Sequence, residues 1–312
     1  MDSINSIEIH DVTISQSPVF IVGCPRSGTT LLQALLSTQN IIYSFPETHF
    51  FSNTYKYIKY DQNANIDITC LDTVFEHIKN KMDLNISGYI LDQIRRISKN
   101  KDLSTKYLFE IIIYICLRNQ LAHNEICNIR WLEKTPGHFR HLDTIKKHYP
   151  MSKIIAIIRE PASVINSRKK NIPQEKEKSV RELAFQWNSA ITCFEEFKTK
   201  YPDDIYIIQY EKIVKNVEFA IQEIGRFLDI TIQPEKLKNY HSEANNIILM
   251  GEYWKNSVKS KAIKNTNNPL NSTLSIIDKL YIHYITSKNK KKYGYAIKFN
   301  NLSGFLPFIS KY

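Results

Sequence analysis

Residues 19–36 read VFIVGCPRSGTTLLQALL, in which an apolar run is followed by a loop between Gly23 and Gly28 and then by a second apolar stretch. A short continuous apolar run is typical of a strand that is buried on both faces of a sheet. The apolar residues after Thr29 fit a helix. Strand, glycine loop and helix in this order place the free N–H groups of the helix start where phosphate oxygens bind. The stretch therefore predicts an α/β protein with a phosphate-binding loop.

Further short runs rich in β-branched residues predict the other strands, and the stretches between them have helical spacing. Strands are predicted at residues 19–23, 41–44, 129–132, 153–158 and 205–209. Helices are predicted at residues 29–37, 138–148, 161–170, 179–200, 214–228 and 274–286. Buried strands that alternate with helices predict a central parallel sheet between two helical layers, the three-layer arrangement of P-loop folds.

The chain shows no internal repeat, low-complexity linker or Pro/Gly-rich boundary. We therefore expect one domain over residues 1–312, with its core at about residues 18–50 and 129–300. Residues 51–128 lack strand signals and have a mostly helical pattern. We expect this segment to form a helical cap insertion beside the active site.

The composition excludes several classes of protein. The cysteines are odd in number and form no C-x-x-C pair, which argues against a disulfide framework and a zinc site; they are Cys24, Cys70, Cys116, Cys127 and Cys193. Residues 1–17 do not resemble a signal peptide, and the most apolar later run, residues 107–117, is too short to cross a bilayer. We expect a cytoplasmic protein without a membrane span.

The net charge of +11 needs an explanation, because basic chains often bind nucleic acid, anionic membranes or small anions. Residues 288–292 are the only dense basic cluster, and a solvated tail near the C-terminus explains them. No helix-turn-helix or aromatic-basic pattern accompanies them, so we expect no nucleic-acid partner.

The phosphate loop departs from the nucleoside-triphosphate pattern at one position. The spacing of Gly23 and Gly28 matches G-x-x-x-x-G-K-[ST], but Thr29 stands where the lysine for the β- and γ-phosphates belongs. Arg26 is the cation inside the loop instead. The residues expected to bind the phosphate group are Arg26, Ser27, Gly28, Thr29 and Thr30.

A second departure follows the predicted strand at residues 153–158. A nucleotide hydrolase usually places an aspartate for magnesium here, whereas this chain has Arg159. Arg159 suits a further phosphate, and Pro161 starts a helix that places Ser167 about two turns along, facing the same crevice. The pattern predicts two separate anion sites without a metal, the charge layout of adenosine 3′,5′-bisphosphate (PAP).

Two segments together resemble a known family. GCPRSGTTL at residues 23–31 and IIREPASVINS at residues 157–167 resemble the 5′- and 3′-phosphosulfate-binding segments of sulfotransferases that use 3′-phosphoadenosine 5′-phosphosulfate (PAPS). The resemblance runs from about residue 18 to residue 296 and is to a soluble, bacterial-type member. It implies PAPS as co-substrate, PAP as product, no metal, and an acceptor that carries a hydroxyl group.

Two further segments look like glycan sulfotransferases such as the heparan sulfate enzymes. They are ETHFF at residues 47–51 and EKTPGHF at residues 133–139. The resemblance implies that Glu47 is the catalytic base and Lys134 the catalytic lysine. Tyrosyl-protein sulfotransferases are similar too, because they share the RSGTTL loop and a glutamate near Glu47. The cytosolic small-molecule enzymes carry a catalytic histidine where this chain has Pro136, so that subfamily's base is missing.

The same resemblance extends to the nucleotide site. QYEKI at residues 209–213 looks like the family's conserved strand end, which adds Tyr210 to the residues that bind the nucleotide. Trp254 and Lys255 resemble the segment that closes over the 3′-phosphate.

The chemistry expected of these residues is a single in-line displacement. Glu47, beside the apolar Phe50 and Phe51, is expected to have a raised pKa that makes it a better base. His49 is the rival base, because it shares a face with Glu47 in an extended segment. Lys134, helped by Arg26, is expected to stabilise charge on the bridging oxygen of the donor.

Several alternatives stay open at this point. A P-loop nucleotide kinase or triphosphatase shares the loop and the sheet, although Thr29 and Arg159 oppose it. A polyanion-binding protein would use the net charge of +11 and show a strong salt dependence. The motifs slightly favour a carbohydrate acceptor over a peptide tyrosine, a lipid or a small alcohol. His138 is interpreted as a helix-start residue that contacts its own backbone.

Overall fold

Five parallel strands form the centre of this computed structural model, which describes residues 17–63, 65–82, 88–100, 103–118, 120–126, 128–263, 265 and 273–295. The strands are β1 (Val19–Gly23), β2 (Ile42–Ser44), β3 (Arg130–Lys134), β4 (Lys153–Ile158) and β5 (Ile205–Gln209). Their order in the sheet is β2-β3-β1-β4-β5, so β1 is the central strand. Cys127 and residue 296, where the family resemblance ends, lie outside the described residues.

The side chains of β1 alternate between two hydrophobic clusters, as a central strand requires. Val19 and Ile21 pack with the helix that follows the phosphate loop, while Phe20 and Val22 pack on the opposite face. All five residues of β1 are buried. Burial on both faces explains why the sequence of this strand is a continuous apolar run.

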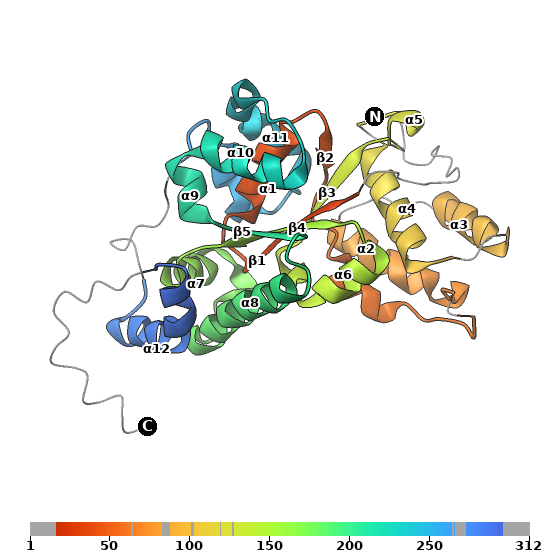
Figure 1. The fold of residues 1–312 in the computed structure, drawn as a ribbon. Coiled ribbons are helices and arrows are strands. Elements are labelled where there is room, and N and C mark those ends of the chain that lie inside the picture. The colour runs from red at the N-terminus through yellow and green to blue at the C-terminus, as the bar shows by residue number, and fades with distance from the viewer. Residues whose placement is uncertain are drawn as a thin grey trace.

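Helices cover both faces of the sheet (Figure 1). One layer contains α1 (Thr29–Ser37), α9 (Tyr210–Lys215), α10 (Val217–Leu228) and α11 (Tyr240–Ile247). The other layer contains α6 (Leu142–His148), α7 (Pro161–Asn171), α8 (Val180–Lys200) and α12 (Ile276–Lys292). The predicted parallel α/β fold is confirmed. No helix in the described ranges has the length and apolar character needed to cross a membrane.

Two stretches, each predicted as one helix, are divided in the structure. The helix predicted at residues 138–148 is divided into a 3₁₀ turn, Pro136–His141, and α6. The helix predicted at residues 214–228 is divided at Asn216: residues 214 and 215 end α9, and α10 begins at Val217 because the Asn216 side chain accepts the N–H of Phe219.

The last helix is longer than predicted. It runs from Ile276 to Lys292, so residues 288–292 are its final turns rather than a tail. Lys290 is buried, and its Nζ lies 3.5 Å from Oε1 of Glu160. The prediction of a solvated tail is therefore wrong for this lysine. Cations at a helix C-terminus are stabilised by the helix dipole, which is consistent with the clustering.

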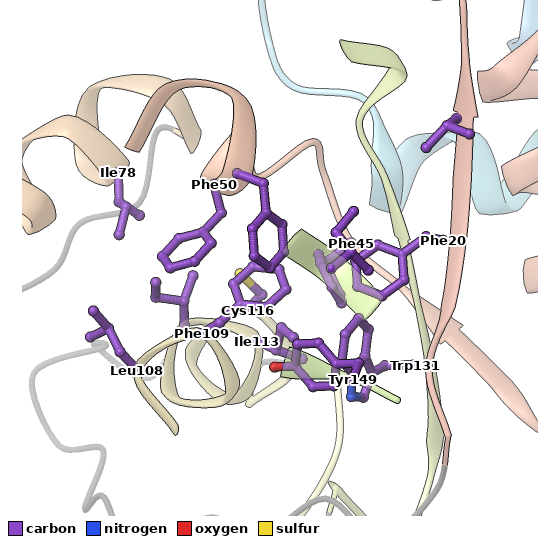
Figure 2. Close-up of a cluster of buried hydrophobic side chains, with 14 of the residues drawn as sticks. Phe20, Phe45, Phe50, Ile78, Leu108, Phe109, Ile113, Cys116, Trp131 and Tyr149 are labelled. Atoms are coloured by element: carbon purple, nitrogen blue, oxygen red, sulfur yellow. The ribbon is translucent and has the colours of Figure 1, made fainter. Parts of the chain in front are cut away.

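Residues 51–128 contain four α-helices in their described parts: α2 (Leu71–Met82), α3 (Gly88–Asn100), α4 (Thr105–Leu117) and α5 (His123–Ile126). They lie beyond the β2–β3 side of the sheet (Figure 1). Figure 2 shows that Phe109 of α4 meets Phe50 in an aromatic cluster that continues to Trp131 of β3. Phe50 and Phe51 are buried, so both are core residues.

Candidate active site

A cavity of about 670 Å³ opens at the carboxyl ends of the strands. Its walls come from the segments that follow all five strands and from residues 252–263. Open parallel sheets bind ligands at this edge. Of the insertion, Ser52 and Asn53 are the lining residues among those described, so the insertion touches the cavity only at its start.

The phosphate loop places the start of α1 at the cavity. Gly28 is the N-cap of α1 and has a φ of +99°, and a Cβ atom at this position would lie 2.5 Å from Cδ2 of Tyr210. Both facts require glycine here. Arg26 also has a positive φ, 73°, which is uncommon for an arginine and is typical of functional loops. Because no side chain caps α1, its first N–H groups are available to an anion.

Two arginines meet beside this loop. Nη1 of Arg159 donates to the carbonyl oxygen of Arg26 at 3.0 Å, and Nε of Arg26 donates to Oγ of Ser167 at 3.1 Å. The Arg159 guanidinium lies 4.4 Å from the centre of the Tyr210 ring. Burial, together with the charge of Arg159, lowers the pKa of Arg26 to about 10. The residues predicted to bind the 5′-phosphosulfate and the 3′-phosphate therefore lie together in one electropositive region.

Glu47 is the centre of a second group of charges. The Glu47 carboxylate accepts hydrogen bonds from Nζ of Lys134 and, at 2.6 Å, from Nζ of Lys255. Lys255 also binds Glu252, and Lys134 donates to Oγ1 of Thr30 at 3.3 Å. Strand β3, the segment after β2 and the C-terminal part of the chain thus meet at one carboxylate.

The prediction of a raised pKa for Glu47 is wrong. Burial raises the pKa of Glu47, but the charges of Lys134 and Lys255 lower it by more, so the net shift is downward. Burial lowers the pKa of Lys134 to about 8, although Glu47 opposes this change. Glu47 is therefore ionised at neutral pH.

His49 lies close to Glu47, as predicted, but not because the segment is extended, since His49 has a left-handed φ of +50°. Its Nε2 is 3.4 Å from Oε2 of Glu47, and the residue lines the cavity. Burial lowers the pKa of His49 more than the Glu47 charge raises it. A neutral imidazole can accept a proton, so the geometry keeps His49 as a rival to Glu47.

Most predicted site residues reach the cavity. Those that line it are Arg26, Gly28, Thr29, Thr30, Glu47, His49, Arg159, Tyr210, Trp254 and Lys255. Three others do not line it: the side chains of Ser27 and Lys134 are fully buried, and the half-buried Ser167 reaches the site only through its hydrogen bond with Arg26. Lys134 is thus covered by Glu47 and Thr30 in this structure.

Sequence reasoning missed Glu252 and the partners of His138. The only signal for Glu252 is its spacing of three residues from Lys255 in the sequence. We expected His138 to contact its own backbone. Its ring instead binds Glu133 and the N–H of Phe51.

A comparison with protein-family models matches residues 18–234 to the family described as "Sulfotransferase family". The chain belongs to this family. The match includes the phosphate loop, Glu47, Lys134 and Arg159. The resemblance predicted from the motifs is confirmed, and this sulfotransferase is an enzyme that transfers a sulfuryl group.

Similar proteins agree with this assignment. A putative protein-tyrosine sulfotransferase of Caenorhabditis briggsae is 23% identical over 253 residues, which cover 78% of this chain and 79% of the relative. The sulfotransferase domain of the Synechococcus PCC 7002 olefin synthase has a similar fold, with a TM-score of 0.60, 16% identity, and coverage of 92% of this chain and 98% of the domain. The sulfotransferase domain from the curacin biosynthetic pathway gives a TM-score of 0.56, 18% identity, and coverage of 89% and 99%.

Proposed function

We propose that the enzyme transfers the sulfuryl group of PAPS to an acceptor hydroxyl, with Glu47 as base and Lys134 as the catalytic lysine. The observation that carries the proposal is the contact between these two residues beside Thr30 of the phosphate loop. A proton acceptor and a cation next to a phosphate-binding loop are the two groups that this displacement requires. In this proposal the chain is one domain, and residues 51–128 are an insertion.

The residues at the donor end fit a nucleotide with two separate phosphate groups. The uncapped start of α1 and Arg26 would hold the 5′-phosphosulfate, and Arg159 with Ser167 would hold the 3′-phosphate. Tyr210, Trp254 and Lys255 line the same cavity and complete the proposed nucleotide site. β4 is followed by Arg159, not by the carboxylate that holds magnesium in a triphosphatase. We therefore expect donor binding without a metal.

The donor, when bound, supplies the sulfuryl group. Glu47 accepts the proton of the acceptor hydroxyl, for which at least one of its lysine contacts has to open, because a carboxylate held by two ammonium groups is a weak base. Lys134 and Arg26 stabilise the negative charge that develops on the leaving oxygen. The chain forms no covalent intermediate in this scheme.

Two acceptor classes have support from different observations. The segments at residues 47–51 and 133–139 look like those of glycan enzymes, which favours a carbohydrate hydroxyl. The relative from Caenorhabditis briggsae is named as a putative protein-tyrosine sulfotransferase, which favours a peptide tyrosine. The two classes are separated by experiment.

The test is transfer of labelled sulfate from PAPS to a panel of oligosaccharides and tyrosine peptides, in buffer that contains a metal chelator. We expect one class to become labelled by the wild-type enzyme and the label to be lost with Glu47→Gln. Labelling that requires added magnesium, or labelling that survives Glu47→Gln unchanged, contradicts the proposal.

A further inference from the structure

Glu133 is a buried carboxylate that the proposed chemistry does not use. It precedes Lys134 on β3, is fully buried and does not line the cavity. Burying a charge is costly unless hydrogen bonds satisfy it. Its oxygens accept hydrogen bonds from the backbone N–H of Thr48 at 3.3 Å, Oγ1 of Thr48 at 2.9 Å, Oγ1 of Thr135 at 2.6 Å and Nδ1 of His138 at 2.9 Å.

The side chains that bind Glu133 also accept hydrogen bonds from the backbone of the segment that follows Glu47. Oγ1 of Thr135 accepts the N–H of His49 at 3.2 Å, and Oγ1 of Thr48 accepts the N–H of Phe50 at 3.2 Å. Nε2 of His138 accepts the N–H of Phe51 at 3.2 Å. The backbone N–H groups of residues 48–51 are thus all bound to Glu133, either directly or through one side chain.

The hydrogen bonds also fix the form of His138. Because Nε2 accepts the Phe51 N–H, the ring proton is on Nδ1, which donates to Glu133. Burial raises the pKa of Glu133, but His138 and the two threonine hydroxyls lower it by more, so Glu133 is ionised. A buried anion with this many donors holds its surroundings in one geometry, because any displacement leaves charge unpaired.

We propose that Glu133 is a positioning residue that holds Glu47 against Lys134, because it binds residues 48–51 to the end of β3. Lys134 is the next residue along the same strand, and Glu47 is the residue before Thr48. Glu133 and Thr48 are hydrogen-bonded to each other, and each is the direct neighbour in sequence of one reacting residue, Lys134 or Glu47. The inference rests on the proposed roles of Glu47 and Lys134.

The test removes one hydroxyl at a time with Thr48→Val and Thr135→Val, which preserve the shape of the side chain. The first readout is the titration of the Lys134 ammonium, followed by NMR of isotope-labelled lysine. In the wild-type protein this group has a pKa of about 8, and the charges that face it are Glu47, Lys255 and Glu252. Glu47 raises this pKa, so its displacement should lower the midpoint by about one unit.

The second readout is donor turnover, which should fall by about 10- to 100-fold in each variant, the usual effect of a small misplacement of reacting groups. Thr48→Ser and Thr135→Ser keep the hydroxyl and should restore the wild-type midpoint. Thr286→Val is the matched control, because Thr286 is equally buried and its hydroxyl donates to the carbonyl oxygen of Ile282 within α12, far from Glu133 in the sequence. It should lower stability without moving the Lys134 titration.

The results separate this inference from the proposed function. If both valine variants lose stability while Lys134 titrates as in the wild type, Glu133 has only a structural role and the inference is wrong. If either folded valine variant shifts the titration and its serine partner does not, the inference holds. The titration requires no sulfuryl transfer, so it is valid even if Glu47 proves not to be the base.

Discussion

The donor end of the cavity and its reaction centre differ in how their charged side chains are arranged. At the donor end the Arg159 guanidinium contacts the backbone of Arg26, and burial together with the charge of Arg159 lowers the pKa of Arg26. At the reaction centre Glu47 and Glu252 face Lys134 and Lys255, so the charges there are paired within the protein. Two neighbouring cations favour an anion at the donor end, whereas the reaction centre has to exchange partners before it can act. Binding and proton transfer should therefore be separable by substitution.

The largest effect is expected from Glu47→Gln, which keeps the shape of the side chain but removes the proton acceptor. Turnover should fall by about 100-fold or more, the usual span for loss of a general base, while affinity for PAP stays nearly unchanged. Steady-state kinetics and calorimetry measure the two quantities.

His49→Ala is the control for this assignment. If Glu47→Gln retains near-normal turnover and His49→Ala abolishes it, the base is His49. Proton transfer at the reaction centre then depends on the imidazole and not on the Glu47 carboxylate. Hydrolysis of the donor to water provides a first assay where no acceptor is known.

Lys134→Ala should lower turnover on the order of 100-fold, as loss of one donor to a developing anion does. It should also weaken PAP binding, because Lys134 lies beside Thr30 of the phosphate loop. Lys134 contacts both Thr30 of the phosphate loop and Glu47 of the reaction centre, so this substitution tests whether one residue serves both donor binding and turnover. Unchanged PAP affinity would restrict Lys134 to the reaction centre.

Arg159→Ala should weaken PAP binding by about 1.5 to 3 kcal/mol, the range for a hydrogen bond to a charged group. The change corresponds to roughly 10- to 150-fold in the dissociation constant. Titration calorimetry measures it directly. An unchanged affinity would remove Arg159 from the donor site and break the comparison at its electropositive end.

The smallest effect is expected in the acid stability of the donor-free enzyme. Since the folded state lowers the pKa of Glu47 below its ordinary value of 4.5, Glu47 contributes stability above pH 4.5 and loses it as the pH falls further. Glu47→Gln should cost on the order of 1–3 kcal/mol of unfolding free energy near pH 6, and less towards pH 3. Chemical denaturation at several pH values measures the difference. A constant difference would show that the pKa of Glu47 is the same in the folded and unfolded states.

The donor end could be predicted from the sequence because its signals are local. β1, β4, β5 and α1 have the predicted bounds, since each combines an apolar run with a clear turn or glycine at its end. The requirement for Gly28 follows from a positive φ that the loop pattern implies. Arg159 follows its strand directly, so its position needed only the strand.

The reaction centre could be predicted only in part because its contacts are distant in sequence. Lys134 and Lys255 are 87 and 208 positions away from Glu47, and their charges together reverse the expected direction of the Glu47 pKa shift. Phe51 and His138 are 87 positions apart, so the role of His138 could not be read from its own surroundings. No local pattern specifies which buried charges will meet across a sheet edge.

The central claim is that the cavity binds a bisphosphorylated nucleoside without a metal, and calorimetry with the wild-type enzyme tests it most directly. PAP is titrated in buffer with a metal chelator, and ATP is titrated with magnesium in parallel. The neighbouring Arg26 and Arg159, with Arg159 in the position directly after β4 where a triphosphatase has its magnesium carboxylate, predict tight binding of PAP and much weaker binding of ATP. Equal affinity for ATP with magnesium would contradict the account.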